Sequence, residues 1–355
     1  MKSIKKNITI HDIARELKLD SSTISRALSD SPRVGIKTKE RVLAKARELG
    51  YHRNLMASNL RTSKTMTIGV VVPYISRYFF SEAIDAIEQT VADKGYRVII
   101  SQSHDDYRIE KKIVDGLFMN RVDGLLISPS MKTPGSSHLN LFYDNKIPIV
   151  IFDRYFKNGG LSKVIFEDKT AAFNLTRHMI DQGCKKIFHL AGSMDSQIYQ
   201  QRCQGYKEAL EKYDLEFNDS FVRSSNLTAE EAVEIIKDIL KDKKNLPDAL
   251  VCGNDISALA IMKYLDEKTK FKVPKDISIG GFSNEPASDL IKPGLTTVDQ
   301  HPFMIGKTAA EMLLDFINNK EKAFLSSNTV VIKSSLIVRG STLKKLNQNR
   351  LRNKS

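Results

Sequence analysis

Residues 8–28, with the sequence ITIHDIARELKLDSSTISRAL, predict two short helices joined by a tight turn. Apolar residues recur every three or four positions along the first helix, which gives it one face that can be buried. Thr9 is placed to cap this helix, with Asp12 three residues further on, and Asp20 is placed to cap the second helix.

The second helix carries polar residues on the side opposite its apolar residues. These are Ser21, Ser22, Thr23, Ser25 and Arg26. Short hydroxyl side chains can reach base edges and phosphates, and an arginine can bind a guanine or a phosphate through two hydrogen bonds. A helix-turn-helix places its second helix in the major groove of DNA in this way. Two helices alone are equally compatible with an ordinary helical hairpin that has a polar outer face.

A third helix is predicted over residues 36–50, with Gly50 at the position where a helix stop is expected. Three such apolar faces can close a small core of roughly 50 residues. We therefore expect an all-α, three-helix DNA-binding headpiece over residues 8–50.

Four motifs in residues 9–61 have a specific order: T-I-x-D-I-A, S-S-T-I-S-R-A-L, T-K-E-R-V and G-Y-x-x-N-x-x-A-x-x-L-R. This order resembles the headpiece and hinge of LacI/GalR-family transcriptional repressors. The resemblance implies a hinge helix and linker over residues 51–64. It also implies DNA contacts from Thr9, Ser21, Ser22, Thr23, Ser25, Arg26, Thr38, Tyr51, Asn54, Ala57, Leu60 and Arg61.

The hinge is too short to be a stable helix alone, because isolated helices below about 12 residues are marginal in water. The resemblance implies that Leu60 is inserted between base pairs in the minor groove and kinks the duplex. The alternative is that Leu60 is only an apolar linker residue. Two residues depart from the family pattern: Arg53 stands where proline is usual, and Lys18 stands where the turn often has glycine.

From residue 65 onward, apolar runs typical of buried parallel strands alternate with amphipathic helices. Repeated units of this kind require parallel sheets with helical crossovers on both faces. Two successive series, which divide near residue 153, predict an α/β body of two doubly wound lobes. The last β segment is expected over residues 329–339, and ligands are expected at the carboxyl ends of the strands.

This body resembles the type I periplasmic-binding-protein fold that LacI/GalR proteins use to sense effectors. The resemblance rests on G-V-V-V-P at 69–73, P-I-V-I-F-D-R at 148–154, R-C-Q-G-Y at 202–206, G-N-D at 253–255 and L-T-T-V at 295–298. It implies three chain crossings between the lobes and an effector-binding and dimerisation domain over residues 65–340. Residues 341–355 are then expected to be a basic, disordered tail.

The predicted effector site gathers residues that follow strands or match family positions. Asp153 and Arg154 come directly after a predicted strand, and aromatic rings such as Phe79 can stack on the apolar faces of sugars. The full set is Phe79, Phe80, Asp153, Arg154, Arg202, Asn254, Asp255 and Ser283. A salt bridge or a helix cap remains an alternative for Arg154 and Asp255, and one phenylalanine is expected in the core. Ser283 stands where the family commonly has aspartate, which favours a ligand with an anionic group over one that needs an acidic acceptor.

Charge is concentrated at the ends of the chain. Residues 1–64 hold 15 Lys and Arg against six Asp and Glu, within a total net charge of +13. A basic end on a nearly neutral body indicates one polyanion-binding region. Residues 1–7 lack a signal-peptide core, and no apolar run approaches the ~20 residues of a membrane helix. The three cysteines, Cys184, Cys203 and Cys252, are scattered, which fits a reducing compartment.

We therefore expect a cytoplasmic, homodimeric transcriptional repressor that binds a pseudo-palindromic operator in double-stranded DNA. It would be controlled by a small effector such as a sugar or sugar derivative, with no membrane partner, cofactor or metal. A solute-binding protein without a DNA role is the alternative for the body alone. An enzyme is not expected, because no P-loop, G-x-S-x-G or G-x-G-x-x-G motif is present.

Overall fold

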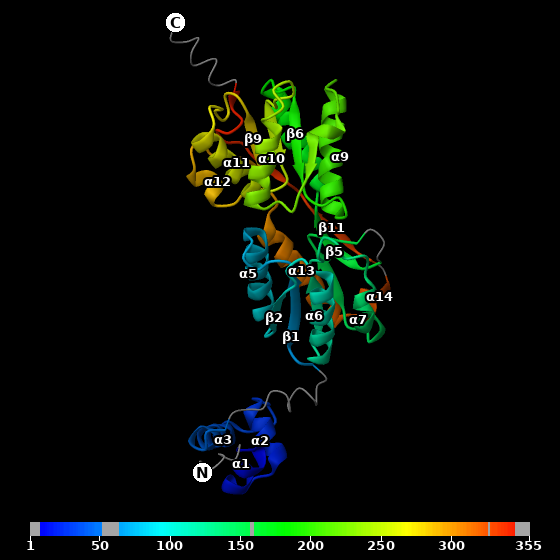
Figure 1. Ribbon diagram of the computed structural model, residues 1–355. Helices are drawn as coiled ribbons and strands as arrows, with labels where there is room; N and C mark the ends of the chain where they lie inside the picture. The colour runs from blue at the N-terminus through cyan, green and yellow to red at the C-terminus, as the bar shows by residue number, and fades with distance from the viewer. Residues whose placement is uncertain (1–7, 52–63, 157–159, 326, 345–355) are drawn as a thin grey trace, which may run out of the picture. The chain divides into compact units, whose positions relative to one another are not determined.

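The computed structural model describes residues 8–51, 64–156, 160–325 and 327–344. The chain divides into two compact units, Met1–Thr65 and Met66–Ser355, and each is described by itself (Figure 1). The predictions for Asn54, Ala57, Leu60 and Arg61 lie outside the described residues.

The first unit contains three helices, α1 (Ile10–Leu17), α2 (Ser21–Leu28) and α3 (Ile36–Glu48). Their buried faces meet in one small core that includes Ile13, Ile24 and Val42, all fully buried. This arrangement agrees with the predicted helix boundaries to within two residues, because the apolar spacing of each segment matches one helical face.

The predicted caps of α1 and α2 differ in outcome. Thr9 and Asp12 form a capping box at α1, in which the Thr9 backbone N–H donates to Asp12 Oδ2 at 2.9 Å. Asp20 occupies the N-cap position of α2, but its side chain makes no capping hydrogen bond, so that part of the prediction is wrong. Lys18 adopts the left-handed conformation at φ 51° and ψ 45° in the turn after α1, where the motif usually supplies glycine.

The second unit begins with a lobe, here called the N-lobe, built on a six-stranded sheet in the order β11-β5-β4-β3-β1-β2. The strands are β1 (Thr67–Val72), β2 (Arg97–Gln102), β3 (Gly124–Ile127), β4 (Ile149–Phe152), β5 (Ser162–Phe166) and β11 (Thr329–Ile332). One face packs against α5 (Tyr78–Ala92) and α13 (Pro302–Asn318), and the other against α6 (Tyr107–Met119), η1 (Ser137–Leu139) and α7 (Asn140–Asp144). A short helix, α14 (Lys320–Leu325), follows α13. The central strands β3 and β4 are buried throughout, as their continuous apolar sequences predict.

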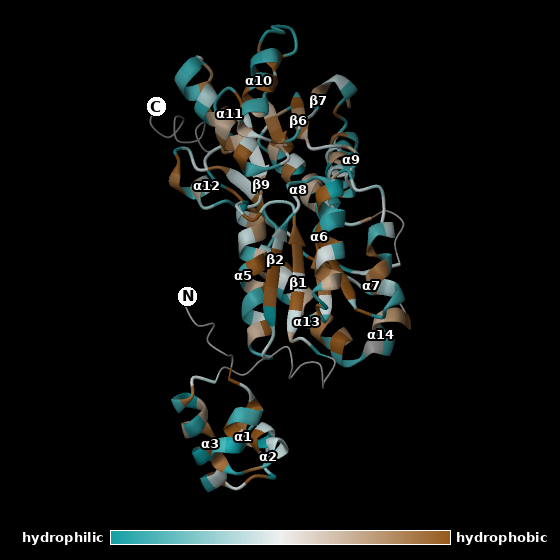
Figure 2. Ribbon diagram, turned by 60° about the horizontal axis from the view of Figure 1, so that its bottom comes forward, coloured by the Kyte–Doolittle hydropathy of each residue, from teal (hydrophilic) through white to brown (hydrophobic). Residues whose placement is uncertain are grey.

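The other lobe, the C-lobe, has a six-stranded sheet in the order β12-β10-β9-β8-β6-β7. Its strands are β6 (Ile187–Ala191), β7 (Val222–Ser224), β8 (Ala249–Cys252), β9 (Ser278–Phe282), β10 (Thr296–Asp299) and β12 (Ser335–Ile337). Its helices are α8 (Asp168–Asp181), α9 (Gln197–Lys212), η2 (Asp219–Phe221), α10 (Ala229–Ile239), α11 (Asp255–Lys268) and α12 (Ala287–Leu290). Figure 2 shows the apolar strands inside and the hydrophilic helix faces outside. The chain passes between the lobes after β5, after β10 and after β11, in agreement with the three expected crossings.

Two details of the sheets differ from the sequence-based expectation. The segment 329–339 is not one strand: β11 pairs in parallel with β5 of the N-lobe, and β12 pairs antiparallel with β10 of the C-lobe. The edge strand β7 was not predicted, because its three residues are partly exposed and give no apolar run.

The expected start of the disordered tail is also wrong. Ser341 and Thr342 are fully buried in the C-lobe, and the Ser341 hydroxyl donates to the carbonyl of Ile279 at 2.5 Å. The Lys344 ammonium donates to the carbonyl of Asp248 at 2.8 Å. The C-lobe therefore extends to Lys344. Among the described helices, none is long and apolar enough to cross a membrane.

Candidate functional site

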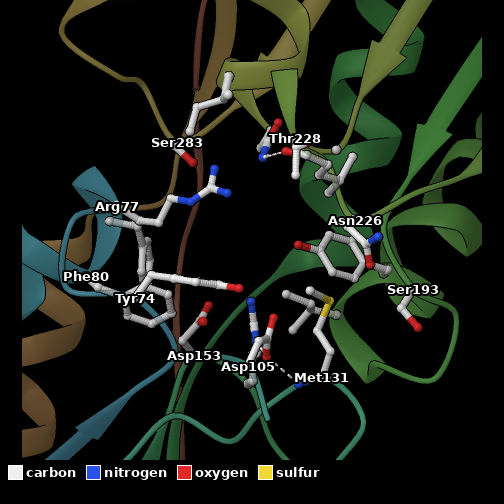
Figure 3. A pocket seen from close by; sticks show the side chains of 18 of the residues that line it. Tyr74, Arg77, Phe80, Asp105, Met131, Asp153, Ser193, Asn226, Thr228 and Ser283 are labelled. Carbon is white, nitrogen blue, oxygen red and sulfur yellow. Dashed lines mark hydrogen bonds and ion pairs between the residues drawn. The ribbon is translucent and has the colours of Figure 1, made fainter. Parts of the chain in front are cut away.

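A cavity of about 350 Å³ lies between the N-lobe and the C-lobe, near the carboxyl ends of their parallel strands (Figure 3). This is where doubly wound sheets bind ligands. Seven of the eight residues predicted for the effector site line it: Phe79, Phe80, Asp153, Arg154, Arg202, Asn254 and Ser283. Their roles as effector contacts remain predictions.

Asp153 is the first residue after β4 and has a left-handed backbone, with φ at 61°. Its carboxylate is buried and accepts a hydrogen bond of 3.3 Å from the Ser128 hydroxyl. Burial raises the pKa of Asp153 from 3.8 to about 6, although the neighbouring Arg154 partly offsets this effect. A buried carboxylate of this kind can accept hydrogen bonds from ligand hydroxyl groups.

Arg154 is 8% exposed and donates from Nη1 to Asp105 Oδ1 at 2.6 Å. Arg154 Nε and Asp105 Oδ2 are buried and have no hydrogen-bond partner among the described residues. A buried donor and a buried acceptor without partners are costly, so this ion pair has unused capacity to bind polar groups.

Arg202 is satisfied within the C-lobe. Its Nε donates to Asp168 at 2.7 Å and its Nη1 donates to the carbonyl of Gly253 at 2.7 Å. The guanidinium also lies 4.2 Å from the centroid of the Phe282 ring. Arg202 therefore forms a fixed wall of the cavity and joins α8, α9 and the end of β8.

The G-N-D motif at 253–255 serves the start of α11. The Asn254 side chain accepts from the backbone N–H of Ser257 and donates to the carbonyl of Leu227. Asp255 is fully buried and does not line the cavity, so the structure contradicts its prediction as an effector residue. Its carboxylate already accepts from the Thr297 and Ser288 hydroxyls and from the Glu285 backbone.

Both phenylalanines of α5 belong to the core and to the cavity wall. Phe79 and Phe80 are buried, and their rings meet edge to face at a centroid distance of 5.2 Å. We expected one of these two phenylalanines in the core, and the structure places both of them there. Ser283 lies at φ 121°, and its hydroxyl donates to Gln300 Oε1 at 3.4 Å.

Sequence reasoning missed several residues that line the cavity. They include Tyr74, Arg77, His104, Asp105, Met131, Lys132, Ser193, Tyr199, Asn226, Thr228, Glu285 and Gln300. Tyr74 and Arg77 follow the buried strand β1, and Asp105 follows β2. The same rule that identified Asp153, a polar residue just beyond the carboxyl end of a strand, could have found all three.

The first unit presents the predicted DNA-binding side of α2 to solvent. Ser22 and Arg26 are exposed, while Ser21, Thr23 and Ser25 are half-buried. Thr9 is exposed at the cap of α1, Thr38 is half-buried in the first turn of α3, and Tyr51 packs against the headpiece core. Among the described residues, no carboxylate forms an ion pair with Arg26, so its guanidinium is available to a phosphate or a base.

Comparison with known proteins decides what these two units are. Residues 9–54 match the model of the bacterial regulatory proteins of the lacI family. Residues 65–338 match the model of the periplasmic binding proteins and sugar binding domain of the LacI family. The chain belongs to the LacI family. This membership makes it a DNA-binding transcriptional regulator and favours that function over a free solute-binding protein.

Two relatives illustrate the likeness over nearly the whole length of this LacI-family chain. The transcriptional repressor CytR of Escherichia coli K12 is 31% identical, covering 94% of this chain and 96% of its own. Catabolite control protein A of Priestia megaterium is 29% identical, covering 95% and 99%. The name of the first relative identifies it as a helix-turn-helix transcriptional repressor.

A solved structure shows the same fold. The Lac repressor dimer bound to operator and the anti-inducer ONPF superposes with a TM-score of 0.84 at 24% identity, covering 95% of this chain and 100% of that one. The predicted architecture, a helical headpiece with two parallel-sheet lobes of the periplasmic-binding-protein type, is confirmed.

Proposed function

We propose that this LacI-family chain represses transcription as a homodimer bound to a pseudo-palindromic operator, and that a small effector in the inter-lobe cavity changes its operator affinity. The proposal includes action in the cytoplasm and a role in binding only, without catalysis. The observation that carries it is the combination of a hydroxyl-rich α2, with Ser22 and Arg26 exposed, and an open cavity between two lobes.

In this proposal α2 lies in the major groove. Arg26 is exposed and one turn after Ser22, so the two side chains can contact bases or phosphates on the same side of the helix. Ser21, Thr23 and Ser25 supply further hydroxyl contacts, and Thr9, Thr38 and Tyr51 contact the flanking backbone. Phosphate contacts set the position of the helix and base contacts set its specificity.

The hinge residues Asn54, Ala57, Leu60 and Arg61 are proposed to act in the minor groove at the centre of the operator. Insertion of an apolar side chain there unstacks a base step and bends the duplex. The proposal rests on the order of these residues in the sequence, with hinge and linker over residues 51–64.

The effector is proposed to be a sugar or a sugar derivative. The aromatic rings of Phe79 and Phe80 offer flat apolar walls, and Asp153 and Arg154 offer hydrogen-bonding groups beside them. The effector can shift operator binding only through its different affinities for the two lobe arrangements.

The decisive experiment measures sequence-specific DNA binding. The full chain is used to select an operator from a random DNA pool. The affinity of the chain for this operator is then compared with its affinity for a duplex of scrambled sequence. Arg26→Ala should weaken binding to the selected operator by about 1–3 kcal/mol and relax the base preference at the position that Arg26 contacts. Arg47→Ala, which removes an exposed arginine from the last turn of α3, is the matched control. If no site is enriched, or if both variants lose affinity equally for every duplex, the proposal is wrong.

A further inference from the structure

Three arginines line the cavity in the part of the chain that the structure describes, and two of them form ion pairs with carboxylates of the protein. Arg154 is paired with Asp105 at 2.6 Å, and Arg202 is paired with Asp168 at 2.7 Å. Arg77 also lines the cavity, but among the described residues no carboxylate lies within ion-pair distance of its guanidinium. Its guanidinium lies 5.6 Å from the centroid of the Tyr74 ring.

Arg77 is held in a position to meet a ligand. It is the N-cap residue of α5, a helix of 15 residues whose first turn carries the cavity residues Phe79 and Phe80. Figure 3 shows the Arg77 side chain extending from the N-lobe into the cavity, toward Ser283 of the C-lobe. The N-terminus of a helix favours negative charge through its free backbone N–H groups and its dipole, which adds to the attraction of the guanidinium.

The C-lobe residue that faces Arg77 is uncharged. Ser283 offers a hydroxyl that already donates to Gln300 Oε1 at 3.4 Å. Glu285 is the acid that the C-lobe contributes to the described cavity lining, and no ion pair joins it to Arg77 among the described residues. Burial raises the pKa of Glu285, and the neighbouring Asp255 raises it further, while Arg77 lowers it in part.

Unsatisfied buried groups elsewhere in the cavity show that its polar lining is incomplete. Arg154 is 8% exposed with no partner for Nε, and Asp105 has no partner for Oδ2 among the described residues. A hydroxyl group can both donate and accept a hydrogen bond, so a ligand hydroxyl suits a lining that has unpartnered groups of both kinds. Together with Arg77, they describe a ligand that has hydroxyl groups near Arg154 and a negative group near Arg77.

We propose that the effector of this protein is anionic, a polyhydroxylated compound with a carboxylate or phosphate group that binds Arg77 beside Ser283. This inference rests on the proposed effector role of the cavity and defines the class of ligand. Two hydrogen bonds from a guanidinium to a carboxylate or phosphate supply both affinity and orientation. A neutral sugar would leave the Arg77 charge unpaired.

The test uses thermal unfolding of the full chain with inorganic phosphate, compared with chloride at the same ionic strength. Because the headpiece also binds anions, the informative quantity is the difference between wild type and Arg77→Gln. Phosphate should raise the Tm of wild type by several degrees more than that of Arg77→Gln. Arg97→Gln removes an exposed arginine of β2 away from the cavity and should respond as wild type does.

Ser283→Asp provides the converse variant, because it places a carboxylate beside Arg77. It should lose the phosphate effect while remaining folded, and in a second arm glucose 6-phosphate should stabilise wild type more than glucose does. Equal phosphate effects in wild type and Arg77→Gln, or no effect in either, would overturn the inference. Failure of the wild-type chain to bind a selected operator would count against the proposed function instead.

Discussion

At the scale of single residues, Asp153 is a buried carboxylate whose ionisation lowers the stability of the folded protein. It is buried at the end of β4, and burial raises its pKa to about 6. Holding this carboxylate ionised in the ligand-free protein at neutral pH is therefore unfavourable compared with the unfolded chain. A ligand hydroxyl that donates to Asp153 would offset part of that cost.

We predict that Asp153→Asn stabilises the ligand-free protein at pH 8 by about 2–3 kcal/mol, from a pKa shift of about two units at 1.36 kcal/mol each. Because the folded-state pKa is raised, the stability associated with the protonated acid is complete below pH 3.8 and is lost as the pH rises through about 6. The gain in the variant should therefore disappear below about pH 4. Urea unfolding of both proteins between pH 4 and pH 8 measures it.

Asp238→Asn serves as the control, because Asp238 is an exposed residue of α10 paired only with Lys241 at 3.6 Å. Its substitution should change the unfolding free energy by no more than a few tenths of a kcal/mol at any pH. A pH-independent effect of Asp153→Asn, or a destabilisation at pH 8, would show that Asp153 is not a strained buried charge.

Seven of the eight residues predicted for the effector site line the cavity, but the sequence could not show which of them already have hydrogen-bond partners. Asp153 and Asp255 both lie just beyond a strand, yet only Asp153 lines the cavity. The Asp255 carboxylate instead accepts hydrogen bonds from the Glu285 backbone N–H and from the Ser288 and Thr297 hydroxyls. All three donors are distant from Asp255 in sequence. Tertiary packing decides which hydrogen-bond partners a side chain has. The position of a residue just after a strand therefore predicts that it lies near the cavity, but not whether its side chain is free to bind a ligand.

At the scale of elements, glycine positions decide how closely helices approach. Gly205 of the R-C-Q-G-Y motif lies where α9 crosses α8, and a Cβ there would be 2.1 Å from the backbone oxygen of Lys169. The motif therefore serves packing as well as the cavity: Tyr206 is fully buried and donates to the carbonyl of Ile187 at 2.7 Å.

We predict that Gly205→Ala destabilises the protein by at least 1–3 kcal/mol, roughly the cost of overpacking, because backbone and not a flexible side chain must move. Gly116→Ala is the matched control: Gly116 lies in α6 and a Cβ there meets nothing within 4 Å. That substitution should stabilise the protein by about 0.4–1 kcal/mol. The stability of both variants is measured by thermal unfolding. If the two substitutions change the stability in the same direction and by a similar amount, this explanation of the motif is wrong.

The boundaries of long, periodic elements could be predicted from the sequence, because a buried face repeats with the period of its helix or strand. The helices predicted over 107–120 and 301–318 agree with the structure to within one residue. Short elements could not be predicted, since α12 has four residues and β7 has three, too few to show a period. The division of segment 329–339 between two sheets depends on strand pairing across the chain, which no local pattern contains.

At the scale of the whole molecule, one edge of the N-lobe sheet is suited to contact a second chain. Strand β2 lies at the end of the sheet order and pairs only with β1. Ile99 and Ile100 of this strand are each 38% exposed, and Figure 2 shows the strand as hydrophobic. Exposed apolar edge strands promote association between chains.

We predict that Ile99→Lys combined with Ile100→Lys weakens the homodimer and, through it, binding to a symmetric operator. Ile109→Lys is the control, because Ile109 of α6 is also 38% exposed but lies on a helix of the same lobe. Analytical ultracentrifugation should show a larger monomer fraction for the double variant only. An unchanged dimer in the double variant would exclude this edge from the interface.

In the proposed function, a ligand in the inter-lobe cavity changes how tightly the headpieces bind DNA. The most direct test is the operator Kd of the full chain, measured with and without a saturating concentration of a compound that raises its Tm. We predict a change of about 5–150-fold, the range of typical coupling between sites, with Arg77→Gln needing more of an anionic compound to reach it. An operator Kd that stays the same while the cavity is occupied would contradict the account.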